Sequence, residues 1–319
     1  MELTEIKPLF DKIKQNIQQV IIGKDDTIEQ LLISMLADRH VLLEDVPGTG
    51  KTMLAKVLAK SIDCSFNRVQ FTPDLLPSDV IGLTIYRQHE GRFEFQQGPI
   101  FTNILLADEI NRATPRTQSS LLEAMEEKQV TIDNNTYVLA APFLVIATQN
   151  PIENQGTFPL PEAQMDRFFI KIQMGYPTKK EGKAILKRFQ QSNPLDQLQA
   201  VTTQSALVEA QASFTSVHVD ESIFDYIIDL AEETRIDEAI DMGLSPRGSQ
   251  ALLRASQARA VIQGRSFVTP DDVKAMFEPV VNHRLAYGPM LEQTDIESLL
   301  QALVNRVEVP TETKGSDLA

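Results

Sequence analysis

The strongest constraint on the fold is a glycine-rich loop between an apolar segment and a helical pattern. Residues 44–61 read EDVPGTGKTMLAKVLAKS, and apolar side chains recur at helical spacing after Gly50. This order is typical of a phosphate-binding loop, in which backbone N–H groups at a helix N-terminus point at an anion. The usual pattern, G-x-x-x-x-G-K-[ST], has glycine where this chain has Asp45. Because Asp45 lies at the strand exit, before the tightest part of the loop, we expect the loop to bind phosphate.

Individual residues of this loop have distinct predicted roles. Gly48 and Gly50 allow the backbone to approach the phosphates closely. Lys51 is expected to reach the β- and γ-phosphates, and the Thr52 hydroxyl to bind Mg²⁺. The alternative is a glycine-rich turn that contains Lys-Thr by chance, and the flanking strand and helix argue against it. The predicted nucleotide contacts in the loop are Asp45, Val46, Pro47, Gly48, Thr49, Gly50, Lys51, Thr52 and Met53.

A second apolar strand is predicted to deliver two carboxylates. Residues 103–109 read NILLADE, so Asp108 and Glu109 stand at the C-terminal end of the strand. Asp108 is expected to hold Mg²⁺ through water, and Glu109 to orient and polarise an attacking water. Taken alone, such a pair is more often a helix cap or a solvated turn. The phosphate loop upstream favours the catalytic interpretation.

Further apolar segments complete a parallel sheet. Residues 143–150 read FLVIATQN, and Asn150 could hydrogen-bond the γ-phosphate or the attacking water, or form a turn before the next proline. Two more strands are predicted at residues 66–71 and 168–172. These three strands, together with the strand before the phosphate loop and the strand before the acidic pair, predict a five-stranded parallel sheet of the α/β class with helices on both faces. Ligands of such sheets gather at the C-terminal ends of the strands.

The remaining segments predict a hairpin and a helical domain. Residues 84–101 read as two short strands around Glu90-Gly91. After residue 176, capping residues and apolar stripes at helical spacing predict only helices. We therefore divide the chain into a nucleotide-binding core (1–175, with the hairpin near 84–101), an all-α lid (176–306) and a disordered tail (307–319).

Composition restricts the function. The net charge of −14 repels phosphate backbones and argues against general nucleic-acid binding. The four histidines and the single cysteine lack the spacing of a transition-metal or nucleophile site. Residues 1–20 do not read as a leader, and no apolar run is long enough to cross a bilayer, so we expect a cytoplasmic protein with no membrane span. ATP hydrolysis is the only reaction that the sequence indicates.

Several longer segments resemble the AAA+ ATPases and, among them, the MoxR family. The resemblance covers most of residues 20–285. The segments that carry it are QFTPDLLPSDVIG (70–82), GPIFTNILLADEINRATPRTQSSLLEAMEE (98–127), ATQNPIENQGTFPLPEAQMDRF (147–168) and GLSPRGSQ (243–250).

The resemblance implies a role for each matching residue. Residues 45–52 are similar to Walker A, residues 103–109 to Walker B, and Asn150 to sensor 1. Arg247 corresponds to sensor 2, which would contact the γ-phosphate from the second domain. Arg167 corresponds to the arginine finger, with Arg112 and Arg116 as alternatives. Ile22 and Gly23, within VIIG (20–23), resemble the segment that contacts adenine.

The resemblance also implies a function. The family hydrolyses Mg²⁺-ATP in a ring, expected to be hexameric, and acts as a chaperone-like motor that remodels or matures a protein complex. Its members often work with a protein that carries a von Willebrand A domain, and sometimes assist metal insertion. A chelatase-like motor subunit and a non-hydrolysing, nucleotide-gated scaffold are the alternatives. Glu109 argues against the scaffold, because a protein that does not hydrolyse ATP needs no intact base.

Overall fold

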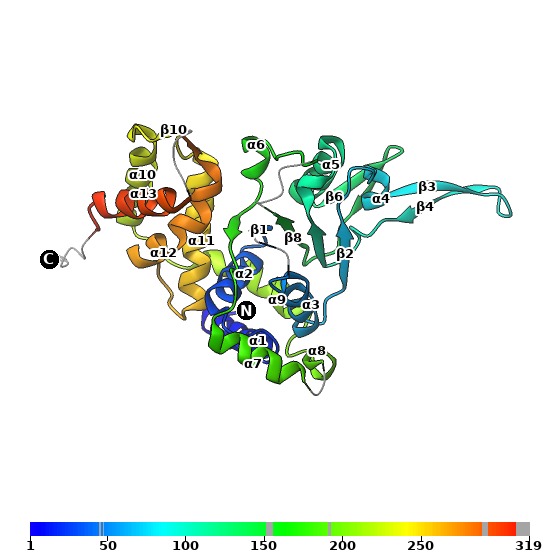
Figure 1. The fold of residues 1–319 in the computed structure, drawn as a ribbon, viewed down its shortest axis with the longest axis horizontal. Helices are drawn as coiled ribbons and strands as arrows, with labels where there is room; N and C mark the ends of the chain where they lie inside the picture. Colours follow the sequence, from blue (N-terminus) through cyan, green and yellow to red (C-terminus); the bar gives the residue numbers. More distant parts are fainter. Residues whose placement is uncertain (45, 47, 151–155, 191–192, 289–292, 311–319) are drawn as a thin grey trace.

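A computed structural model describes residues 1–44, 46, 48–150, 156–190, 193–288 and 293–310 (Figure 1). The predicted loop residues Asp45 and Pro47, and most of the predicted disordered tail, therefore lie outside the described residues.

The predicted five-stranded parallel sheet is confirmed. Its strand order is β2-β5-β8-β1-β9, and every neighbouring pair is parallel. The strands end within two residues of the predicted positions. Their bounds are Val41–Glu44 (β1), Phe66–Gln70 (β2), Ile104–Asp108 (β5), Leu144–Gln149 (β8) and Ile170–Ile172 (β9).

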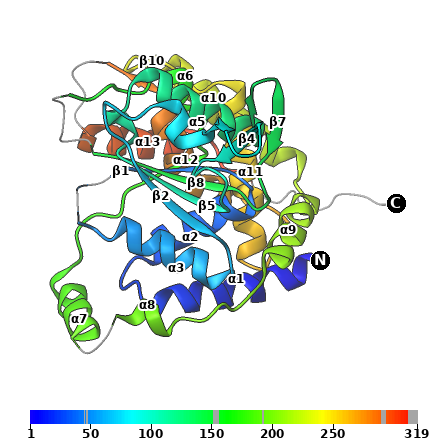
Figure 2. The same cartoon turned by 90° about the vertical axis from the view of Figure 1, so that its right-hand side faces the viewer.

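Helices cover both faces of the sheet, as its apolar strands require. Successive residues of a strand point to opposite faces, and in β5 Leu106 packs in one buried cluster with α1–α3 whereas Leu105 packs in another with α5. Figure 2 shows α2 and α3 on one side of the sheet and α5 on the other. The helices of this half are α1 (Leu3–Gln18), α2 (Asp25–Leu36), α3 (Lys51–Ser61), α4 (Pro77–Ile81), η1 (Ile110–Arg112), α5 (Pro115–Glu127) and α6 (Glu162–Met165).

Two antiparallel hairpins extend from this core. The predicted hairpin is confirmed as β3 (Gly82–Arg87) and β4 (Arg92–Gln97), which protrude from the molecule (Figure 1). A second hairpin, β6 (Gln129–Ile132) and β7 (Asn135–Val138), was not predicted. The rings of Phe95 and Tyr137 stack with centroids 4.1 Å apart and connect the two hairpins.

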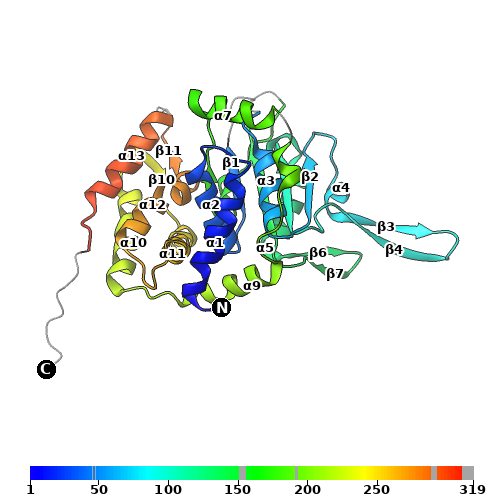
Figure 3. The same ribbon diagram turned by 90° about the horizontal axis from the view of Figure 1, so that it is seen from below.

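The C-terminal part is mainly helical, as predicted. Helices α10–α13 lie on the side of the core opposite to the protruding hairpin (Figure 3). A short antiparallel pair, β10 (Ile240–Met242) and β11 (Ala286–Tyr287), was not anticipated. The helices are α7 (Lys179–Phe189), α8 (Pro194–Gln197), α9 (Gln204–Ser213), η2 (Phe214–Ser216), α10 (Glu221–Ile236), α11 (Pro246–Ile262), α12 (Pro270–Val281), η3 (Asn282–Arg284) and α13 (Gln293–Arg306).

A buried histidine makes the stability of the core depend on pH. The backbone N–H of Val145 donates to His40 Nδ1 (3.0 Å), and Nε2 lies 2.9 Å from the Met125 carbonyl, so the ring fits as the neutral Nε2–H tautomer. Burial lowers the pKa of His40 to about 4. The unfolded chain takes up this proton near pH 6.5, so the contribution to stability is complete above pH 6.5 and is lost as the pH falls toward 4.

We therefore predict that lowering the pH from 7.5 to 5 reduces the unfolding free energy of wild type by about 2 kcal/mol more than that of His40→Gln, because only wild type has this titrating histidine. Urea unfolding at the two pH values measures it. An equal loss in both proteins would contradict the prediction.

Candidate active site

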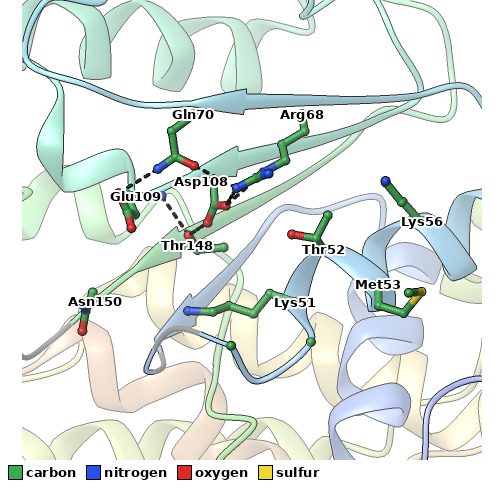
Figure 4. Close-up of a pocket in the computed structure, with 12 residues that line it drawn as sticks. Lys51, Thr52, Met53, Lys56, Arg68, Gln70, Asp108, Glu109, Thr148 and Asn150 are labelled. Atoms are coloured by element: carbon green, nitrogen blue, oxygen red, sulfur yellow. Dashed lines mark hydrogen bonds and ion pairs between the residues drawn. The ribbon is translucent and has the colours of Figure 1, made fainter. Parts of the chain in front are cut away.

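Eight of the predicted site residues meet in one pocket at the C-terminal edge of the sheet. The pocket has a volume of about 450 Å³ (Figure 4). The predicted residues that line it are Gly48, Gly50, Lys51, Thr52, Met53, Asp108, Glu109 and Asn150. The other lining residues are Lys56, Arg68, Gln70 and Thr148.

The glycine-rich loop has the backbone that an anion site needs. Helix α3 begins at Lys51, directly after the loop, and so its first N–H groups have no partner within the helix. Gly48 and Gly50 have φ angles of +84° and +99°, a region that favours glycine, and a Cβ built on either meets nothing within 4 Å. The left-handed backbone, not crowding, therefore requires glycine here. Lys51 and Thr52 extend from α3 toward the strand ends that carry Asp108 and Asn150 (Figure 4).

Asp108 is held by two partners from neighbouring strands. The Thr148 hydroxyl donates to Oδ1 at 2.5 Å, and Arg68 donates to Oδ2 from Nη2 at 2.6 Å and from Nε at 3.1 Å. The same Thr148 oxygen accepts the backbone N–H of Glu109 at 2.8 Å. Thr148 thus fixes the positions of both acidic residues at the end of β5.

Glu109 has an unusual backbone conformation. Its φ of +56° lies in the left-handed region, which is uncommon for a residue other than glycine and is concentrated at functional sites. Its Oε2 accepts hydrogen bonds from Gln70 Nε2 (2.7 Å) and from Arg112 Nη1 (3.0 Å). The carboxylate is therefore held in a fixed position at the edge of the pocket.

Four residues of the pocket were not predicted from the sequence: Lys56, Arg68, Gln70 and Thr148. Gln70 is paired with Asp108 across β2 and β5, and Arg68 is two residues earlier on the same face of β2. For β2, the available signal was a pair of polar residues two positions apart, Arg68 and Gln70, which share one face of the strand. For β8, it was a buried threonine that follows four apolar residues.

Arg167 and Arg247 lie together but outside this pocket. Both line a second cavity of about 690 Å³, and both form ion pairs with Glu126. The structure therefore does not bring Arg247 to the phosphate loop of its own chain. Of the alternative fingers, Arg112 pairs with Glu109, and Arg116 is exposed in the first turn of α5.

Four predicted nucleotide contacts that the structure describes, Ile22, Gly23, Val46 and Thr49, do not line the pocket. Val46 and Thr49 belong to the loop, where the Thr49 hydroxyl donates to the Val46 carbonyl at 3.3 Å. Gly23 lies beside α7, and a Cβ on it would overlap the Glu181 side chain. Asp45 and Pro47 are outside the described residues.

Among the residues that the structure describes, no helix is long and apolar enough to span a membrane.

Comparison with known families agrees with this geometry. Residues 40–170 match the family described as ATPase family associated with various cellular activities (AAA), and residues 232–303 match the AAA lid domain. The first match contains the phosphate loop and strands β1, β2, β5 and β8, and it ends at the first residue of β9. The second contains most of the helices that follow α9.

Individual relatives narrow the family. YeaC from Bacillus subtilis is 46% identical over 97% of both chains. Chaperone MoxR1 from Mycobacterium tuberculosis is 38% identical over 92% of this chain and 80% of its own, and Protein MoxR from Paracoccus denitrificans is 34% identical over 90% and 91%. A crystal structure of a presumed ATPase from Cytophaga hutchinsonii superposes with a TM-score of 0.89 at 38% identity, covering 97% of each chain. The chain therefore belongs to the MoxR family of AAA+ ATPases.

Proposed function

We propose that this protein hydrolyses Mg²⁺-ATP in the pocket between the phosphate loop and the strand ends. The observation that carries the proposal is the convergence of a lysine at a helix N-terminus with two carboxylates and an amide. A cation and the N–H groups of a helix N-terminus suit the phosphates, and a carboxylate beside them suits the activation of water. Membership of an ATPase family supports the same reaction.

The residues present fit the triphosphate and the metal. Lys51 would bind the β- and γ-phosphates, beside the open space at Gly48 and Gly50. Thr52 and Asp108 offer a hydroxyl and a carboxylate, the oxygen ligands that Mg²⁺ prefers when phosphates and water complete its shell. Bound there, Mg²⁺ would neutralise charge on the phosphate oxygens.

Glu109 and Asn150 would act on the attacking water. Glu109 orients and polarises it as the general base, and its rigid connection to Gln70, Arg112 and Thr148 limits the number of carboxylate orientations. Asn150, buried at the end of β8, would donate to the γ-phosphate or position the same water.

The arginines are proposed to complete the site from an adjacent subunit. Arg167 and Arg247 share a cavity that no described residue of the phosphate loop lines, so we place them at a neighbour's nucleotide in a head-to-tail ring. Arg167 would be the finger and Arg247 the second γ-phosphate contact. We expect this ring to be hexameric.

The proposed output is a change of shape in a client protein complex. Similarity to a protein named Chaperone MoxR1 supports a chaperone-like role. The proposed motor remodels or matures its client with a von Willebrand A domain protein as partner, and metal or cofactor insertion is one form of this work. The constrained Glu109 favours this motor over a non-hydrolysing scaffold. A chelatase-like motor is less well supported, because the named relatives are MoxR proteins.

Lys51→Ala tests the pocket. We expect ATP affinity to fall about 10–100-fold, because charge-assisted hydrogen bonds to the phosphates are lost. Calorimetric titration with Mg²⁺-ATP measures the affinity. Lys60→Ala is the matched control: it removes the same charge from the same helix, but Lys60 donates to the Leu195 carbonyl outside the pocket. Equal affinities of wild type and Lys51→Ala would overturn the proposed binding mode.

A further inference from the structure

One glutamate connects the two arginines that we assign to an adjacent subunit's nucleotide. Glu126 lies in the last turn of α5. Its Oε2 is 3.1 Å from Arg167 Nε, and its Oε1 accepts a hydrogen bond from Arg247 Nη2 at 2.9 Å. Each carboxylate oxygen therefore binds one arginine, although these arginines are eighty positions apart in the sequence.

Cations exceed anions around this cavity. Of its two carboxylates, Asp166 is bound mainly by Arg284, at 2.6 Å, and its nearest approach to Arg247 is 4.0 Å. Burial, and then the nearby Arg254 and Arg247, lower the pKa of Arg39, as expected where cations crowd one another. The charged lining residues are Arg39, Glu126, Asp166, Arg167, Arg247, Arg254 and Arg284.

The backbone that follows Arg167 is fixed independently of Glu126. The buried Arg284 donates from Nη2 to the Phe168 carbonyl (2.6 Å) and from Nη1 to the Phe169 carbonyl (3.1 Å). His283 Nε2 lies 2.8 Å from the same Phe168 carbonyl. The turn is thus anchored to the C-terminal helices, and what Glu126 adds is the direction of the Arg167 side chain.

We propose that Glu126 is a positioning residue that holds Arg167 and Arg247 together as one pair of cations for the nucleotide of an adjacent subunit. This inference rests on the proposed function. Two free arginines would repel each other and sample many rotamers, and both effects oppose their joint approach to one phosphate. A carboxylate between them orders the pair beforehand, and charge that is already in place stabilises a transition state most effectively.

The same contacts make Glu126 suitable for substitution. Its side chain is 37% exposed, and those of Arg167 and Arg247 are 28% and 49% exposed. Ion pairs between such partly exposed groups contribute little to folding. Removing the carboxylate should therefore disturb the direction of the arginines and leave the fold intact.

The first experiment measures steady-state hydrolysis. We expect Glu126→Ala to lower kcat on the order of 10²-fold, the effect of a small misplacement of catalytic groups, with equilibrium ATP affinity unchanged. Glu126→Gln keeps one acceptor oxygen and should give an intermediate kcat; it also serves as the test if the alanine variant does not fold. Glu127→Ala is the matched control, since Glu127 is exposed on the same helix and the described structure gives it no ion pair.

The second experiment mixes subunits. Glu126→Ala has an intact phosphate loop, and Lys51→Ala has an intact arginine pair, so their mixed rings should regain hydrolysis at the interfaces that combine the two. A mixture of Glu126→Ala with Arg167→Ala should regain none, because neither protein supplies a complete pair.

These results separate the inference from the proposed function. If wild type hydrolyses ATP and Glu109→Gln does not, an unchanged or raised kcat in Glu126→Ala overturns the role of Glu126 alone. Recovery of activity with Arg167→Ala would likewise overturn it. A wild type that hydrolyses no ATP would overturn both.

Discussion

Replacing Glu109 by Gln should lower the rate of ATP hydrolysis by about 10²–10⁴-fold, the usual contribution of a general base. The amide keeps the size of the side chain and an acceptor oxygen for Gln70 or Arg112, but it cannot take a proton from water. Binding of ATP should persist, because Lys51 and the loop N–H groups are unchanged. Phosphate release and calorimetric titration on the same preparation measure the two quantities.

The appropriate control for this variant is Glu123→Gln. Glu123 is exposed on α5, so the substitution changes the same charge outside the pocket. Phosphate release at the wild-type rate in Glu109→Gln would exclude Glu109 as the base. If wild type itself releases no phosphate in any partner condition, the scaffold alternative is favoured.

The parts of the site that could be predicted from the sequence are those that local chemistry determines. A helix that begins at the Lys-Thr pair, directly after the glycine-rich loop, has first N–H groups without a partner inside the helix. These groups point toward the loop, where an anion can bind. Strands that are apolar on both faces are typical of a parallel sheet. The C-terminal ends of such strands lie at one edge, and Asp108 and Asn150 stand at these ends. In the structure α3 begins at Lys51, and Asp108 and Asn150 line the same pocket.

The parts that could not be predicted depend on register. Strand β2 is one of the two edge strands of the sheet, so its polar residues could have faced solvent, and its pattern alone does not show which of them reaches the site. Only the pairing of Gln70 with Asp108 brings Gln70 and Arg68 to the acidic pair. Thr148 depends in the same way on its place beside β5.

The meeting of Arg167 with Arg247 could not be predicted from the sequence either. The resemblance placed Arg247 at the γ-phosphate, contacted from the second domain, but in the structure Arg247 lines a different cavity from Lys51. Its position is set by the packing of α11 against the turn that carries Arg167, through the buried Arg284 and the carboxylates of Glu126 and Asp166. No local pattern in either segment records this contact.

Arg167→Ala should nearly abolish hydrolysis. Arginine fingers of other nucleotidases contribute about 10³–10⁵ in rate, because a guanidinium beside the γ-phosphate stabilises the charge that moves onto its oxygens as the phosphoryl group transfers. Binding of ATP should remain, since Arg167 does not line the pocket that contains Lys51. Phosphate release and titration calorimetry distinguish this loss of turnover from a loss of binding.

Mixing inactive proteins determines whether Arg167 acts between subunits. Arg167→Ala retains a good phosphate loop and Lys51→Ala retains a good finger, so a mixed ring contains some interfaces with both. Those interfaces should restore part of the hydrolysis at concentrations where rings exchange subunits. If labelled subunits exchange and no activity returns, Arg167 is either not the finger or acts within its own subunit. Arg112 and Arg116 would then be substituted in the same assay. Arg112 already binds Glu109 of its own chain, so it would have to break that pair to serve a neighbour, whereas Arg167 would keep its pair with Glu126 in the proposed arrangement.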